Sequence, residues 1–236
     1  MISPQKKHIR VAIIDNSIEP LIYRPVEHWS KFLGTPFASF RAPEGRLPHL
    51  KGDFTHIILT GSEASIVERE PWVDKEAAFV QDAVAHGLPI LGSCYGHQLL
   101  ALALGGADRV RRCPQPEVGW YPIQIIEKNS LLGDKGVVFA FCSHFDEAVG
   151  LGPEYRILAS SPGCPIQAFK LRGLPVWGIQ FHPEIDIPDA RRFLHNLIEL
   201  GLPTAPIFSG ALRTKPRDSG LIRRIVRHFL GAKVAK

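Results

Sequence analysis

Several features that would place a chain in a structural class at once are missing from this sequence. No apolar run approaches the ~20 residues that a membrane-spanning helix needs. The basic residues near the N-terminus are not followed by the apolar stretch and small-residue cleavage site of a secretory signal. These absences predict a globular protein of the cytoplasm with no transmembrane segment.

Cysteine is scarce, and its spacing argues against a framework of disulfides or metal ligands. The sequence has four cysteines, none in a C-x-x-C pair, and no two of its ten histidines are four residues apart. A chain of 236 residues can bury a hydrophobic core without cross-links. We therefore expect free thiols and no metal site, although an oxidising compartment would still allow two disulfides.

Acidic residues are outnumbered only because of the C-terminal segment. The chain has 28 Lys and Arg against 23 Asp and Glu. Residues 212–236 hold eight of the basic residues and a single acid, so the remainder carries a small net negative charge. The basic character thus belongs to the tail, and no nucleic-acid binding is expected of the chain as a whole.

Apolar runs alternate with helical patterns in the first half of the chain. Ile9–Ile14, His56–Leu59 and Leu88–Leu91 are short and almost entirely apolar, as strands covered on both faces of a parallel sheet are. Helical patterns are predicted over 70–86 and 97–104. This order predicts an α/β fold with a doubly wound, mostly parallel central sheet and helices on both faces.

The second half has shorter strand-like runs separated by Gly, Pro, Asn and Asp, which predicts a smaller antiparallel strand region. A helical pattern returns at 189–200. The strand-like runs are Trp120–Ile126, Val137–Phe141, Tyr155–Ala159, Ile166–Leu171 and Val176–Phe181.

The composition changes after the helical pattern at 189–200. We predict one domain over 1–205, followed over 206–236 by a proline-spaced linker and a basic amphipathic helix. Leu221, Ile225 and Phe229 recur at helical spacing with arginines between them. The favoured interpretation is a helix packed on the domain with a solvated basic face. The alternative is docking on an acidic partner, an anionic membrane surface or nucleic acid.

The most informative stretch is ILGSCYGHQ, in which an apolar run leads into Cys94 with a glycine two residues to either side. Such glycines remove the Cβ clashes of a tight strand-to-helix turn that presents a nucleophile at the sheet edge. The start of a helix favours a thiolate at Cys94, and the N–H of Tyr95 would point toward a developing oxyanion. Taken alone, the motif is equally compatible with a buried structural cysteine.

Two further motifs follow other strand-like runs. The FHPE stretch contains His182, which can take and return the thiol proton, and Glu184, which can fix the histidine tautomer. Gly61 and Ser62 follow another strand, and the N–H of Ser62 is the candidate for a second oxyanion donor. Each motif alone is compatible with an ordinary turn, but their combination with Cys94 predicts a Cys-His-Glu triad.

These pieces, in this order, resemble the class I (triad-type) glutamine amidotransferases, most closely the glutaminase domain of GMP synthase and its stand-alone relatives. The resemblance is carried by GSCYGHQLLALALGG, GIQFHPE and ILTGSEAS, and it covers roughly residues 8–200. It implies a flavodoxin-like fold, with Cys94 as nucleophile, His182 as base and Glu184 as the third triad member. Ser62 and Tyr95 match the positions whose N–H groups form the oxyanion hole.

The resemblance also implies a substrate and a partner. In the family, the triad hydrolyses the side-chain amide of glutamine through a γ-glutamyl thioester and passes ammonia to a synthase, without a metal or organic cofactor. Because the sequence has neither a P-loop nor a Ser-Gly-Gly-x-Asp-Ser nucleotide loop, that synthase would be a separate chain. The positions that hold the glutamine substrate match Gly61, Gln98, Ser143, His144 and Phe145.

Two positions depart from the family pattern and keep other functions open. Ser62 stands where a GMP synthase-type turn has glycine, and Phe145 stands where such a site often has glycine. Both changes put the substrate in question more than the chemistry, so a γ-glutamyl peptide hydrolase with the same triad is the alternative. A catalytically silent regulatory homologue is the third hypothesis, against which the intact triad argues. The sequence predicts no oligomeric state.

Overall fold

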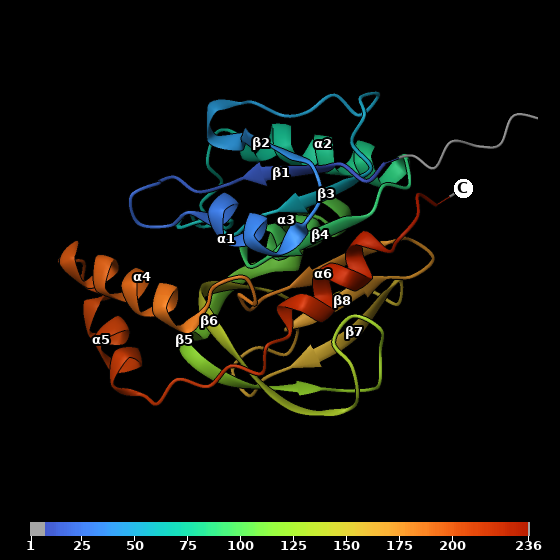
Figure 1. Cartoon of the computed structure of the whole chain (residues 1–236). Coiled ribbons are helices and arrows are strands. Elements are labelled where there is room, and N and C mark those ends of the chain that lie inside the picture. The colour runs from blue at the N-terminus through green and yellow to red at the C-terminus, as the bar shows by residue number, and fades with distance from the viewer. Residues whose placement is uncertain (1–7, 236) are drawn as a thin grey trace, which may run out of the picture.

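The computed structural model describes residues 8–235 and shows nine strands in a single sheet, ordered β2-β1-β3-β4-β9-β8-β7-β5-β6 (Figure 1). The strands are β1 Val11–Asp15, β2 Phe37–Arg41, β3 His56–Leu59, β4 Ile90–Ser93, β5 Val110–Ile125, β6 Gly136–Ala148, β7 Tyr155–Ser160, β8 Ala168–Leu171 and β9 Val176–Ile179.

The sheet is mixed, which corrects the prediction of a mostly parallel sheet. Strands β2, β1, β3, β4 and β9 pair in parallel, whereas β9, β8, β7, β5 and β6 pair antiparallel. The reason lies in the connections, because a parallel pair needs a crossover of a dozen or more residues. Short loops join the later strands, and β5 and β6 are long strands of 16 and 13 residues that pair directly.

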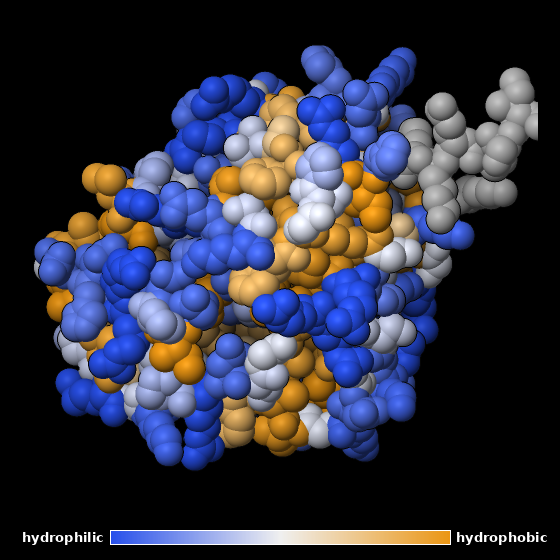
Figure 2. Space-filling view, in the orientation of Figure 1, coloured by the Kyte–Doolittle hydropathy of each residue, from blue (hydrophilic) through white to orange (hydrophobic). Residues whose placement is uncertain are grey.

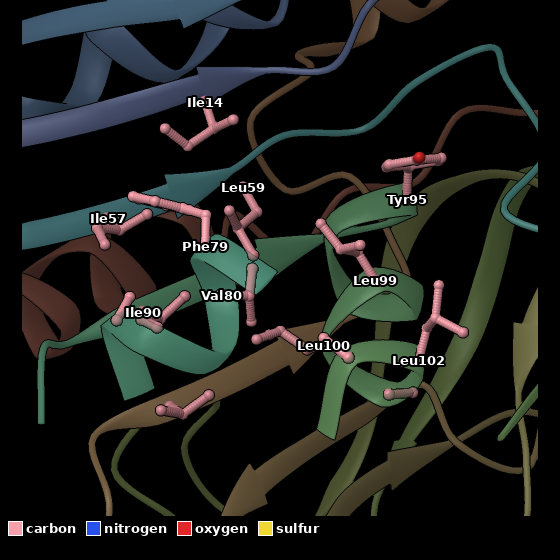
Figure 3. Packing of buried hydrophobic residues seen from close by; sticks show 14 of the residues in the cluster. Ile14, Ile57, Leu59, Phe79, Val80, Ile90, Tyr95, Leu99, Leu100 and Leu102 are labelled. Carbon is pink, nitrogen blue, oxygen red and sulfur yellow. The ribbon is translucent and has the colours of Figure 1, made fainter. Parts of the chain in front are cut away.

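Among residues 8–235, six α-helices accompany the sheet and cover both of its faces. On β1, Ala12 and Ile14 pack with residues of α2 and α3, as Figure 3 shows for Ile14 and its neighbours. The alternate residues, Val11 and Ile13, pack with α1 and α6 on the other face. The helices are α1 Pro25–Leu33, α2 Val73–Ala85, α3 Tyr95–Gly105, α4 Ile187–Glu199, α5 Ala205–Arg213 and α6 Ile222–Leu230.

The C-terminal part differs from the predicted linker and helix. Within 206–236, the proline-spaced stretch contains most of α5, which lies beside α4 (Figure 1). Phe208 of α5 and Leu197 of α4 belong to a hydrophobic cluster with Phe141 of β6. These two helices therefore build a wall against the antiparallel half of the sheet.

Helix α6 packs its apolar side on the sheet. Leu221, Ile225 and Phe229 are buried in one cluster with Trp177 of β9. The arginines of α6 face outward, and Figure 2 shows hydrophilic residues over this helix next to a hydrophobic area. This arrangement favours the interpretation of a packed helix with a solvated basic face. Within residues 8–235, no helix combines the length and apolar character that crossing a bilayer requires.

Candidate active site

Cys94 stands at a strained turn between β4 and α3. Its backbone angles are φ 49° and ψ −105°, and it is one of two non-glycine residues with positive φ among residues 8–235. Its N–H donates to the carbonyl of Ile179 at the end of β9, at 2.8 Å. Residues in such backbone regions persist only where their surroundings hold them, and they gather at functional sites.

The two glycines that flank Cys94 are required by close packing. A Cβ on Gly92 would overlap the carbonyl oxygen of Gly96, and a Cβ on Gly96 would overlap the carbonyl oxygen of Leu59 on β3. The N–H of Gly96 also donates to the carbonyl of Thr60 at 3.1 Å. The G-x-C-x-G pattern therefore locks the turn against the neighbouring strand.

His182 and Glu184 lie in the segment that follows β9, which is the neighbour of β4. The Nδ1 atom of His182 is 2.8 Å from Oε1 of Glu184, and both side chains are buried. Burial lowers the pKa of His182, but the charges of Glu184 and Cys94 outweigh it and raise the pKa to about 10. The imidazole therefore holds a proton beside the Cys94 side chain across the neutral range.

Tyr23 also contacts the carboxylate of Glu184, and the sequence motifs gave no sign of it. Its hydroxyl donates to Oε1 of Glu184 at 3.0 Å and lies 3.5 Å from Nδ1 of His182. The hydroxyl of Ser93 donates to the other carboxylate oxygen at 3.4 Å. Tyr23 stands in a loop 161 residues before Glu184, so no local pattern connects the two.

Gly61 and Ser62 follow β3 on the other side of β4. A Cβ on Gly61 would lie 2.9 Å from both the ring of His182 and the hydroxyl of Tyr23, so this position admits only glycine without displacement. The backbone N–H groups of Ser62 and Tyr95 have no hydrogen-bond acceptor within residues 8–235. The side chain of Tyr95 itself is buried in the core (Figure 3).

The four other predicted substrate positions lie near Cys94 with different roles in packing. The thiol of Cys94 is 3.7 Å from the carbonyl of Ser143. The amide of Gln98 donates to the carbonyl of Asp146 at 2.7 Å. The ring of Phe145 packs against Phe208, with centroids 6.1 Å apart. Most of the predicted binding and oxyanion positions line one cavity, namely Ser62, Gln98, Ser143, His144 and Phe145. Tyr95 and Gly61 do not line it.

The imidazole of His144 is committed to a buried network behind this cavity. Its Nε2 atom is 3.2 Å from Oε2 of Glu117, and its Nδ1 atom is 3.1 Å from the carbonyl of Asp146. Glu117, Cys142 and His144 place their side-chain atoms within 4.8 Å of one another. Glu117 also accepts from Ser161 and Gln167, at 2.7 and 2.6 Å. Both ring nitrogens of His144 and both carboxylate oxygens of Glu117 therefore have partners within this network.

The cavity over Cys94 has a volume of about 410 Å³. Cys94 and His182 both line it, so a reacting group can reach thiol and imidazole together. Cavities of roughly 300–1,000 Å³ are typical of small-molecule sites. A nucleophile, a buried histidine and an orienting carboxylate at such a cavity suit acyl transfer through a covalent intermediate.

Comparison with known proteins agrees with this chemistry. The family model "Glutamine amidotransferase class-I" matches residues 35–198. A subunit of the glutamine-hydrolysing GMP synthase of Pyrococcus furiosus is 43% identical over 101 residues, 42% of this chain and 52% of the relative. The corresponding protein of Sulfolobus acidocaldarius is 35% identical over 157 residues, 66% of this chain and 79% of the relative. The first of these matches thus spans about half of the relative's length.

Solved structures show the same fold. A glutamine amidotransferase of Thermotoga maritima superposes with a TM-score of 0.72 at 20% identity, covering 95% of this chain and 99% of that one. A glutamine amidotransferase of Methylobacillus flagellatus gives a TM-score of 0.73 at 22% identity, covering 98% and 96%.

Proposed function

The chain belongs to the class-I glutamine amidotransferase family, and we propose that it hydrolyses the side-chain amide of glutamine and delivers the ammonia to a separate synthase chain. The observation that carries the proposal is the arrangement of Cys94 in a strained turn beside His182, which Glu184 holds at 2.8 Å. An orienting carboxylate, a buried imidazole and a nucleophile at a helix start are what a thiolate mechanism requires.

The first half of the reaction forms a thioester. The thiolate of Cys94 attacks the carboxamide carbon, and the carbonyl oxygen takes up the negative charge. The proton on His182 then passes to the departing nitrogen, the C–N bond breaks and ammonia leaves. Glu184 stabilises the imidazolium until this proton is transferred, and it keeps the second ring nitrogen of His182 aimed at the reacting atoms.

Water completes the cycle. His182, now neutral, takes a proton from a water molecule that attacks the thioester carbon, and glutamate leaves as Cys94 returns to its starting state. The unpaired N–H groups of Ser62 and Tyr95 are the proposed donors to the oxyanion in both halves. Removing one such donor costs about 100- to 1,000-fold in rate in other enzymes.

We assign the amino-acid end of glutamine to the polar part of the cavity. Gln98 lies one helical turn after Cys94, and the carbonyl of Ser143 on β6 is 3.7 Å from the Cys94 thiol. The side chain of Asp146 lines the same cavity. Gly61 keeps room beside the ring of His182. His144 contributes through its backbone and through the Glu117 network, since both of its ring nitrogens have partners.

A separate synthase is proposed as the ammonia acceptor. The relatives from Pyrococcus and Sulfolobus are named as one subunit of a GMP synthase, and such a name implies a further chain. The proposed place of the reaction is the cytoplasm, where free glutamine is available. The partnership is tested in two ways. The chain should co-purify with a synthase chain, and the mixture should aminate the synthase's substrate when glutamine is the only nitrogen source.

Hydrolysis of γ-glutamyl peptides is the second candidate function, because Phe145 and Phe208 pack together and both line the cavity. Its discriminating test is the release of amino acids from γ-glutamyl dipeptides, compared with ammonia release from glutamine. The silent regulatory homologue predicts no turnover of either substrate.

The decisive experiment measures glutamate and ammonia release from glutamine by wild type, Cys94→Ala and Cys164→Ser. Cys164 is a buried thiol that does not line the cavity, so its variant is the matched control. We expect turnover in wild type and in Cys164→Ser, and none in Cys94→Ala. If wild type is silent, a chloroketone analogue of glutamine reports whether Cys94 alkylates. Absence of both turnover and alkylation would overturn the proposal.

A further inference from the structure

The cavity over Cys94 has two chemically different ends. At the polar end, the carboxylate of Asp146 accepts from Ser65 Oγ at 2.6 Å and pairs with Arg112 at 3.2 Å. The opposite end is apolar and is formed by α4, α5, the loop between them and the loop before α1. Its side chains are Ile22, Phe193, Leu197, Leu200, Leu202 and Phe208.

His182 decides which end receives the leaving group. Because this imidazole protonates the departing nitrogen, that nitrogen must lie against the His182 ring. The rings of Tyr23 and Phe141 flank His182, with centroids 5.8 and 6.2 Å away. Phe193 packs edge-on against both of these rings, at 5.7 and 6.2 Å. Phe193 lines the same cavity as Cys94 and His182, so we assign a substituent on the amide nitrogen to the side of the cavity that Phe193 forms.

The apolar end offers more surface than ammonia can use. Leu200 and Leu202 expose 48% and 47% of their surface at its rim. The carboxamide nitrogen of glutamine carries only hydrogens, so glutamine would leave these side chains in contact with water. An apolar group on that nitrogen would cover them, and covering apolar surface is the main source of affinity in such cavities.

We propose that the cavity accepts γ-glutamyl amides whose nitrogen carries an apolar alkyl or aromatic group, with glutamine as the smallest member of this substrate class. The inference rests on the proposed function because it uses the same thioester chemistry. The bond from Cys94 Sγ to the γ-carbon forms, the C–N bond breaks, and the amine leaves with the proton from His182. Water then cleaves the thioester to glutamate, so no further reactant is needed.

The first test compares kcat/KM for glutamine and for γ-glutamyl methylamide, propylamide, butylamide and benzylamide. The alkylamines have similar basicity, so their leaving-group chemistry is matched. Each added methylene is expected to raise kcat/KM about threefold to fourfold, and the benzylamide is expected to exceed glutamine at least tenfold. A value that falls along the series would overturn the inference.

A rim variant and a control locate the effect. Leu202→Ser is expected to lower the ratio of benzylamide to glutamine kcat/KM about threefold or more, because Leu202 lines the apolar end. Val137→Ser is the control, since Val137 is 57% exposed on β6 and lies outside this cavity. An unchanged ratio in Leu202→Ser would contradict the assignment of the amine to this end.

Binding to Cys94→Ala separates failure of the inference from failure of the proposed function. Turnover of glutamine without turnover of the N-substituted amides would overturn only the inference. Turnover of the N-substituted amides alone would overturn the glutaminase proposal and would remove glutamine from the substrate class, but it would leave the apolar amides in that class. If nothing is turned over, calorimetry on Cys94→Ala decides. A Kd for the benzylamide at least tenfold below that for glutamine supports the inference. Equal values overturn it and leave the apolar rim as a surface for a protein partner.

Discussion

Replacing Tyr23 by phenylalanine tests whether the triad depends on a residue outside the sequence motifs. The hydroxyl donates to Oε1 of Glu184 at 3.0 Å, and this oxygen is also the partner of His182. A hydrogen bond to a charged group contributes about 1.5–3 kcal/mol to stability. We therefore expect Tyr23→Phe to lower the free energy of unfolding by about 1.5–3 kcal/mol, measured by urea denaturation at neutral pH.

The kinetic consequence follows from the freedom that Glu184 gains. With one partner fewer, the carboxylate orients His182 less firmly, and a loss of about 1.4 kcal/mol in transition-state stabilisation would lower kcat/KM tenfold. With Ser93 and His182 as its remaining partners, the carboxylate also attracts the imidazolium more strongly. We assign the fall of kcat/KM at high pH to deprotonation of His182, and we expect this fall to move to higher pH in the variant.

Tyr155→Phe provides the comparison for this experiment. Tyr155 is also buried, but its hydroxyl has no hydrogen-bond partner within residues 8–235, and it does not line the cavity. If both variants lose the same stability and leave kcat/KM and the pH profile unchanged, Tyr23 is only a packing residue and the reasoning is refuted.

Three further changes follow from the structure. Gly96→Ala would press a methyl group on the carbonyl of Leu59, so we expect a melting temperature lower by several degrees and loss of turnover; unchanged values would show that the turn can relax. Glu184→Gln removes the charge that raises the pKa of His182 to about 10, and kcat/KM is expected to fall about 100- to 10,000-fold. The raised pKa of His182 contributes stability that is fully present below about pH 6.5 and is lost as the pH rises through 10. Denaturation measured as a function of pH should therefore show that wild type loses more stability between about pH 6.5 and 10 than Glu184→Gln does. Burial raises the pKa of Glu76 to about 8, so the free energy of unfolding should fall by up to about 1.4 kcal/mol per pH unit between about pH 4.5 and 8. Glu76→Gln should flatten this fall. If the stability curves of the variant and wild type run parallel over this pH range, Glu76 finds a partner when it is ionised.

The parts of the site that depend on local sequence were predictable. The turn around Cys94 requires glycines two residues away on each side, and both can be read directly from the amino-acid sequence. His182 and Glu184 are two residues apart, so their contact needs no knowledge of the fold. Tyr23 could not be found in this way, because its contact with Glu184 depends on how a loop crosses the sheet edge.

Two early elements also escaped the sequence patterns. Strand β2 lies at the sheet edge, where Phe37 is 42% exposed and no continuous apolar run marks the strand. Helix α1 starts at Pro25 without a side-chain cap, in a stretch rich in proline and charge. Both elements form because they pack on β1, and such tertiary contacts leave only weak traces in the sequence.

The apolar end of the cavity was missed for a different reason. Residues 206–216 contain prolines and suggested a linker, yet Pro206 stands in the first turn of α5, where proline is compatible with a helix. Phe208 then packs with Phe145 over the cavity. A proline-spaced segment thus supplies part of the cavity wall, and the proposed substrate class depends on a region that sequence analysis had separated from the domain.

The strand order explains why a mixed sheet builds this site. Gly61 and Ser62 follow β3, Cys94 follows β4 and His182 follows β9, and these three strands are adjacent and parallel. In sequence, 82 residues separate β4 from β9. The antiparallel strands β5 to β8 occupy that interval and bring the chain back beside β4 in the parallel direction. The antiparallel half therefore contributes the Glu117 network and supports the wall of α4 and α5, which pack on Phe141 of β6. It also determines that histidine and cysteine meet at the same edge.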